Sequence, residues 1–190
     1  MNLLYLHGFN SSPQSLKARQ TGEWLAACHP DIRFICPLMP PRPDGAIAAI
    51  EAATTGIDWT QTLVAGSSMG GFYATWAAEK FGCKALLINP AVRPWLGREY
   101  LLGEQANFHT GEKHVMRQQD IDNFANYGVA AISRPENIWV LLQTGDEVLD
   151  YRQAVDFYRG CRVTVEEGGD HSFQNFERYL PEILRFWKGA

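Results

Sequence analysis

Six short apolar runs, separated by stretches with helical character, constrain the fold of this chain more than any other feature. The runs cover residues 2–6, 32–36, 61–65, 84–88, 138–143 and 162–166. Most of them are nearly continuous in apolar residues, which is typical of strands that are covered on both faces. Because such strands alternate with helical segments, the sequence predicts an α/β fold around a mainly parallel sheet of about six strands, flanked by helices.

The segments between these runs predict the helices. Ser12 and Pro13 are typical of a helix start, and we expect that helix to extend to about residue 28. Further helices are expected over 46–54, from the glycine-rich turn at 66–71 to about residue 80, over 151–159 and over 173–187. The length of 190 residues predicts a single domain over 1–190.

One segment, residues 93–134, breaks the alternation. It is polar, contains several aromatic residues and has no clear strand pattern. We interpret it as a small helical insertion, with two or three short helices, lying like a lid over the carboxyl edge of the sheet and hence over any site there.

Composition argues against several classes of protein. The formal net charge of −4 disfavours a nucleic-acid partner. No run approaches the ~18 apolar residues of a membrane span, and the first residues lack the pattern of a secretion signal, so we expect a cytoplasmic protein. The four cysteines form no CxxC pair, so no metal site is expected.

The loops that follow the predicted strands contain residues whose side chains can take part in catalysis or ligand binding. They are residues 7–10, 66–70, 144–147 and 168–171, after the first, third, fifth and sixth strands. In parallel sheets these loops gather at one edge, where ligands bind. They supply a serine, an acid and a histidine in the chain order of the α/β-hydrolase triad.

The serine is identified by its glycines. Gly66 and Gly70 frame Ser68 in a G-x-S-x-G pattern, which places the central serine on a tight turn from strand to helix. The backbone N–H of Met69, at the helix start, and that of Phe9, after the first strand, are the candidate oxyanion donors.

A serine hydroxyl needs a base and an acid beside it. His171, in GGDHSF after the last strand, is the predicted base. Asp146 is the predicted acid because it stands three residues before Leu149 at a helix start, and Asp150 is the main alternative. His7 is expected to bond to loop backbone.

The glycine-rich turn does not fit a nucleotide site. GSSMGG lacks the G-x-G-x-x-G spacing, and no Gly-Lys-Ser/Thr sequence occurs in the chain. We therefore expect no organic cofactor.

Five stretches together resemble a known family: YLHGFNSSPQSLKA, GSSMGGFYATW, NPAVRP, TGDEVLDYRQA and EGGDHSF. In these motifs and in their order the chain is similar to the YqiA-type small bacterial esterases of the α/β-hydrolase superfamily. The resemblance implies a compact hydrolase acting on small-molecule acyl esters or thioesters. It also implies a triad of Ser68, Asp146 and His171.

The sequence thus favours a serine esterase that works through an acyl-enzyme. The main alternative is an acyl-CoA or other acyl-thioester hydrolase, with Arg93, Arg98 or Lys113 meeting phosphate groups. A lyase or a non-catalytic binding protein of the same fold is a more distant alternative. The sequence does not predict the oligomeric state.

Overall fold

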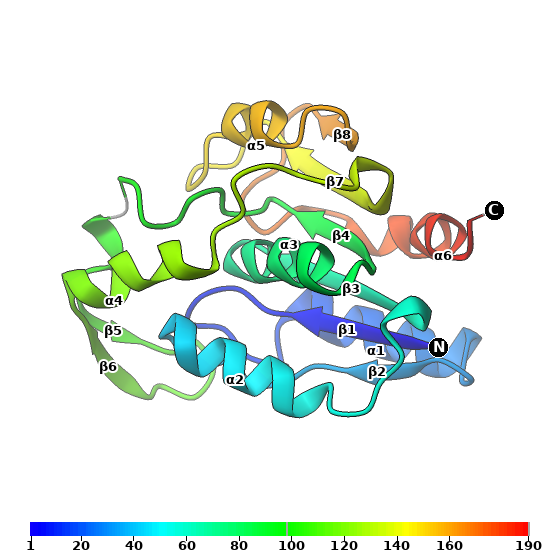
Figure 1. Cartoon of the computed structure of the whole chain (residues 1–190), viewed down its shortest axis with the longest axis horizontal. Coiled ribbons are helices and arrows are strands. Elements are labelled where there is room, and N and C mark those ends of the chain that lie inside the picture. Colours follow the sequence, from blue (N-terminus) through cyan, green and yellow to red (C-terminus); the bar gives the residue numbers. More distant parts are fainter. Residues whose placement is uncertain (98, 190) are drawn as a thin grey trace.

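A single parallel sheet forms the centre of the computed structural model, which describes residues 1–97 and 99–189. Within these residues its strand order is β2-β1-β3-β4-β7-β8 (Figure 1). The strands are β1 (Asn2–Leu6), β2 (Arg33–Ile35), β3 (Thr62–Ser67), β4 (Lys84–Ile88), β7 (Ile138–Gln143) and β8 (Arg162–Glu166). The predicted α/β class and the six parallel strands are confirmed.

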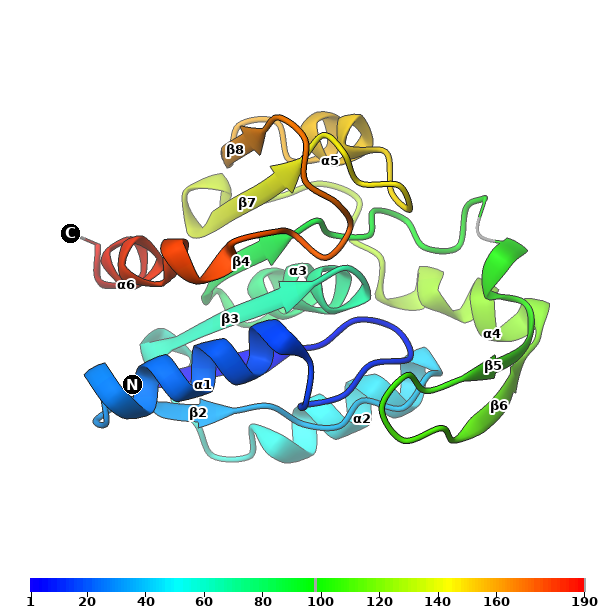
Figure 2. The same ribbon diagram turned by 180° about the vertical axis from the view of Figure 1, so that it is seen from behind.

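Helices cover both faces of this sheet. They are α1 (Leu16–Cys28), α2 (Pro43–Ala53), α3 (Met69–Phe81), α5 (Tyr151–Phe157) and α6 (Leu180–Lys188). Along β1, Leu4 and Leu6 pack into the core shared with α2, α3 and α5, whereas Leu3 and Tyr5 pack into the core with α1 and α6. This alternation follows from the two-residue period of a strand. It yields a three-layer molecule, with α1 and α6 on the face seen in Figure 2.

The chain reverses its direction of travel across the sheet at β1. After β1 the chain forms β2 on one side of it and then crosses to form β3 on its other side, where Leu6 of β1 pairs with Gly66 of β3. The later strands β4, β7 and β8 are added outward from β3. Such a switch point opens a crevice at the carboxyl ends of the two central strands. The loops after β1 and β3 therefore lie next to each other.

The insertion over 93–134 differs from the helical expectation. It contains an antiparallel hairpin of β5 (Gly103–Ala106) and β6 (Lys113–Met116), together with the short α4 (Gln118–Asp122). Three-residue and five-residue 3₁₀ turns, η2 (Glu99–Leu101) and η3 (Asn123–Tyr127), complete it. The hairpin lies beyond the carboxyl edge of the sheet, on the side of β1 and β2 (Figure 1). Short, mostly solvent-facing strands carry little apolar alternation, which is why the sequence pattern did not reveal them.

Two helix starts also differ from expectation. The helix predicted from Ser12 begins at Leu16, because the Ser12 hydroxyl and carbonyl accept the N–H groups of Gln14 and Ser15 in a preceding turn. The helix predicted from residue 173 begins at Leu180, after the 3₁₀ turn η5 (Phe176–Tyr179). Phe173, with a φ of 58°, has left-handed backbone that an α-helix cannot contain.

The remaining 3₁₀ turns, η1 (Trp59–Gln61) and η4 (Pro135–Asn137), lead into β3 and β7. In the part of the chain that the structure describes, none of the helices has the length and apolar character needed to cross a bilayer.

Candidate active site

Ser68 occupies a strained turn between β3 and α3. Its φ of 55° and ψ of −120° place a non-glycine residue in a region that costs about 1–3 kcal/mol. The turn is held from both sides, since the Ser68 N–H donates to the Ile88 carbonyl at 2.9 Å and the Ser68 carbonyl accepts the Ala91 N–H at 3.0 Å. The neighbouring strand β4 thus fixes the backbone that presents the hydroxyl.

The two glycines of the motif are required by close backbone contacts. A Cβ added to Gly66 would lie 2.1 Å from the Gly70 carbonyl oxygen, and one added to Gly70 would lie 1.9 Å from the Leu6 carbonyl oxygen. Real Cβ atoms do not approach backbone this closely. The G-x-S-x-G spacing is therefore a consequence of strand and helix meeting at this turn.

The structure brings the three predicted side chains together in one hydrogen-bonded chain. His171 Nε2 lies 2.9 Å from Ser68 Oγ, and His171 Nδ1 lies 2.8 Å from Asp146 Oδ2 and 2.9 Å from Oδ1. Because the carboxylate can only accept, Nδ1 carries the proton, and in the neutral ring Nε2 accepts from the serine hydroxyl. This is the arrangement in which a histidine removes a proton from a serine.

Asp146 is itself immobilised. Its side chain is 2 % exposed, and its Oδ1 accepts the N–H groups of Val148 and Leu149 at 2.9 and 2.8 Å. The alternative acid, Asp150, has a different place: it caps α5 through the Arg152 N–H and forms an ion pair with the Arg152 side chain. Geometry therefore separates the two candidates, and only Asp146 contacts His171.

The two predicted oxyanion donors flank the serine. Met69 is the first residue of α3, where backbone N–H groups have no partner within the helix. The Phe9 loop lies against the same turn, since a Cβ added to neighbouring Gly8 would be 3.5 Å from Ser68 Cβ. Among the described residues, none accepts a hydrogen bond from the Phe9 N–H. In the described part of the chain the Met69 N–H likewise has no hydrogen-bond acceptor.

Two buried amide side chains, which the sequence analysis missed, hold the loop that carries His171. Asn89, directly after β4, donates from Nδ2 to the Asp170 and His171 carbonyls at 3.0 and 3.2 Å, while its Oδ1 accepts the Gln143 N–H. The side chain of Gln143, the last residue of β7, accepts the N–H groups of Asp170 and Gln174. A polar residue directly after a buried strand is the one sequence signal that could have marked Asn89.

A lysine from α1 supports the same loop. Lys17 Nζ donates to the Ser172 carbonyl, one residue past His171. Burial lowers the pKa of Lys17 to about 8, an effect that the nearby Asp170 carboxylate opposes. Asp170 in turn accepts hydrogen bonds from the Ser172 hydroxyl and the Gln174 side-chain amide, which stabilise the loop around His171.

His7 is occupied with loop backbone, as expected. Its Nε2 accepts the Met39 N–H at 3.0 Å and its Nδ1 donates to the Gly8 carbonyl at 2.9 Å. Burial lowers its pKa, so the ring is neutral at pH 7. It joins the loop after β2 to the loop after β1.

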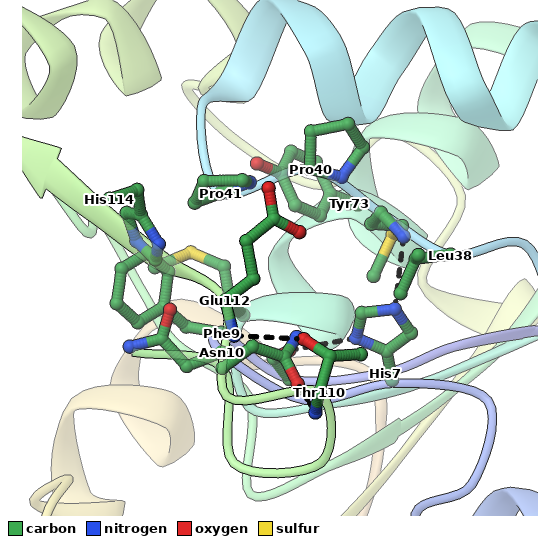
Figure 3. A pocket seen from close by; sticks show the side chains of 14 residues that line it. His7, Phe9, Asn10, Leu38, Pro40, Pro41, Tyr73, Thr110, Glu112 and His114 are labelled. Carbon is green, nitrogen blue, oxygen red and sulfur yellow. Dashed lines mark hydrogen bonds between the residues drawn. The ribbon is translucent and has the colours of Figure 1, made fainter. Parts of the chain in front are cut away.

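A cavity of about 200 Å³ opens beside the loop after β1, which contains Phe9 (Figure 3). Its wall includes Phe9 and Met69, the loop after β2, and side chains from the β5–β6 hairpin. The hairpin is tied to the Phe9 loop by three hydrogen bonds, among them the Phe108 N–H to the Asn10 carbonyl at 2.7 Å. The insertion therefore shapes the cavity next to the serine.

The cations considered for phosphate binding have other contacts. The Arg93 guanidinium lies 5.7 Å from the centre of the Phe157 ring, and Lys113 pairs with Glu104 at 2.8 Å. Arg98 lies outside the described residues.

The switch-point crevice, the strained serine turn and the hydrogen-bonded Ser68, His171 and Asp146 together define a protein of the α/β-hydrolase fold. The chain belongs to the UPF0227 family, described as an uncharacterised protein family, whose model matches residues 2–188. A UPF0227 protein of Serratia proteamaculans (strain 568) is 23 % identical over 190 residues, which cover 97 % of each chain. The family resemblance that the sequence motifs indicated is thereby confirmed.

Solved structures show the same fold. Est1E of Butyrivibrio proteoclasticus with bound ferulic acid has a TM-score of 0.73 at 16 % identity, covering 100 % of this chain and 90 % of that one. Mouse alpha/beta hydrolase domain-containing protein 10 has a TM-score of 0.72 at 13 % identity, covering 100 % and 90 %. The esterase domain of a Rhodothermus marinus protein has a TM-score of 0.65 at 16 % identity, covering 98 % and 85 %.

Proposed function

We propose that this protein is a serine hydrolase that cleaves carboxylic esters. The observation that carries the proposal is the continuous chain of hydrogen bonds from Ser68 Oγ through His171 to the buried Asp146. A serine hydroxyl is a weak nucleophile, and this chain supplies the base that activates it. Esterases among the proteins of similar fold add support for the ester as substrate.

The reaction proceeds in two halves. Ser68 Oγ attacks the carbonyl carbon while its proton passes to His171 Nε2, and the oxyanion receives hydrogen bonds from the Met69 and Phe9 amides. The imidazolium, stabilised by Asp146, then gives the proton to the leaving alcohol as the acyl–oxygen bond breaks. His171 then takes a proton from a water molecule, whose oxygen attacks the acyl carbon. The imidazolium returns this proton to Ser68 Oγ as the bond between Oγ and the acyl carbon breaks, which releases the acid.

Hydrolysis of p-nitrophenyl esters by the wild type and by Ser68→Ala tests the proposal. Loss of the nucleophile is expected to lower kcat/KM by about 10⁴-fold or more, because the triad acts as a unit. Ser67→Ala is the matched control, since Ser67 belongs to β3 and makes none of the hydrogen bonds that link Ser68, His171 and Asp146. A fluorophosphonate probe should label the wild type and not Ser68→Ala. Equal turnover by the wild type and Ser68→Ala would refute the assignment.

The thioester alternative uses the same triad and differs only in the leaving group. The contacts of Arg93 and Lys113 give it no specific support over the ester. Competition between p-nitrophenyl esters and acyl-CoA substrates for one enzyme sample separates the two activities.

A further inference from the structure

The cavity beside Phe9 and Met69 is placed to hold one half of an ester substrate. Its wall contains both proposed oxyanion donors, whereas His171 is not among its lining residues. The leaving oxygen must face His171 Nε2 to receive its proton, so it points away from the cavity. If the proposed function holds, the cavity therefore receives the acyl group.

The cavity suits a short acyl group. At about 200 Å³ it is smaller than the ~300–1,000 Å³ of pockets that take drug-sized ligands. Much of its wall is apolar, with Leu38, Met39, Pro40 and Pro41 from the loop before α2 and Tyr73 from α3.

Glu112 adds a negative charge at the same place. Its side chain extends across the cavity toward Pro41 and Tyr73 (Figure 3). In the described part of the chain no cation forms an ion pair with it, because Lys113 pairs with Glu104 and Arg42 pairs with Asp120.

The histidine in the wall does not offset this charge. Burial, and after it the Arg42 guanidinium, lower the pKa of His114 below its usual value, an effect that the Glu112 carboxylate opposes, so the neutral ring predominates at pH 7.

We propose that the acyl group bound in this cavity ends in a positively charged nitrogen that bears hydrogens. An ammonium group has three donors, no acceptor and a positive charge, which matches the Glu112 carboxylate in the cavity wall. An acyl group that ends in a carboxylate meets repulsion from Glu112, and Arg42, the cation whose charge reaches His114, is already paired with Asp120. Glu112 is then the residue that sets specificity by charge.

Three small ethyl esters test this inference: ethyl 3-aminopropanoate and ethyl butanoate, which have nearly equal shape, and the slightly larger monoethyl succinate. Their acyl ends are cationic, neutral and anionic at pH 7, and hydrolysis is followed by proton release. The wild type is expected to favour the cationic over the neutral ester by about fivefold in kcat/KM, the scale that exposed ion pairs reach. Ethyl 6-aminohexanoate and ethyl heptanoate repeat the comparison of a cationic with a neutral ester for a longer acyl chain.

Substitutions at Glu112 isolate the charge. Glu112→Gln is expected to abolish the preference, so that the cationic and the neutral ester have equal kcat/KM, and Glu112→Lys is expected to favour monoethyl succinate instead. The matched control is Glu104→Gln, which removes a carboxylate of the adjacent strand outside the cavity wall and should keep the wild-type order.

The outcomes separate this inference from the proposed function. Turnover of ethyl butanoate without a charge preference, or a preference that survives in Glu112→Gln, overturns the inference alone. No turnover of any ester by the wild type overturns both.

Discussion

At the scale of single residues, the parts of the site differ in how far the sequence reveals them. Ser68 could be predicted because backbone contact forces glycine at positions 66 and 70, and this constraint leaves a spacing in the sequence. Asn89 leaves only a weak signal, a polar residue directly after a buried strand, because the role of a buried amide is set by its three-dimensional partners and leaves no spacing. That Asn89 positions the base was therefore visible only in the fold.

Asn89 offers a test of that positioning role. In Asn89→Asp the carboxylate still accepts the Gln143 N–H but loses the hydrogen bonds that Asn89 donates to the Asp170 and His171 carbonyls. We expect kcat to fall by about tenfold to a hundredfold with little change in KM, because displacing the base weakens proton transfer more than binding. Steady-state kinetics with a p-nitrophenyl ester measure both constants.

A matched control distinguishes positioning from general damage. Asn137→Asp removes a comparable hydrogen bond, from Asn137 Nδ2 to the Gly82 carbonyl at the end of α3 remote from the triad. It should leave kcat unchanged. A kcat of Asn89→Asp equal to that of the wild type, in a folded protein, contradicts the role.

At the scale of elements, the buried strands were predictable and the hairpin was not. The expected runs 84–88, 138–143 and 162–166 agree with β4, β7 and β8. A central strand that is buried on both faces needs apolar residues at nearly every position, so it is recognisable in the sequence as a continuous apolar run. The hairpin of β5 and β6 is largely exposed and is held by contacts such as Asn10 to Gln105, which act across a long stretch of chain.

Helix α1 is coupled to the His171 loop through Lys17, and this coupling predicts a pH dependence of stability. Burial lowers the pKa of Lys17 to about 8 in the folded protein, whereas an unfolded lysine titrates near ~10.4. Between these values the unfolded chain binds more protons, so the free energy of unfolding contributed by this group rises with pH from about 8 to about 10.4.

Urea unfolding at several pH values measures this contribution. The stability of the wild type should increase relative to Lys17→Met as the pH rises through that window. Lys80→Met, which removes an exposed lysine paired with Glu51, is the control and should show no such trend. A constant difference between wild type and Lys17→Met would show that Lys17 titrates as it does in the unfolded chain.

At the scale of the whole molecule, the candidate triad is assembled from both layers of helices. Ser68 is the N-cap residue of α3, whose side chains share one core with α2 and α5. His171 precedes Phe173, which packs with α1 and α6 into the core on the opposite face. The sheet lies between the two cores, so the serine and the histidine meet only when both layers are docked.

This assembly predicts that activity and global structure are lost together. Trp187 of α6 is 7 % exposed, and Trp187→Ala is expected to lower the free energy of unfolding by about 3–5 kcal/mol. Because α6 follows the His171 loop in the chain and shares a core with Phe173 of that loop, the midpoint of heat inactivation should fall together with the midpoint of unfolding by circular dichroism. Leu16→Ala, at a side chain that is 62 % exposed, should move neither midpoint. Inactivation of Trp187→Ala well below its unfolding midpoint would instead indicate that α6 and the His171 loop detach as a separate unit.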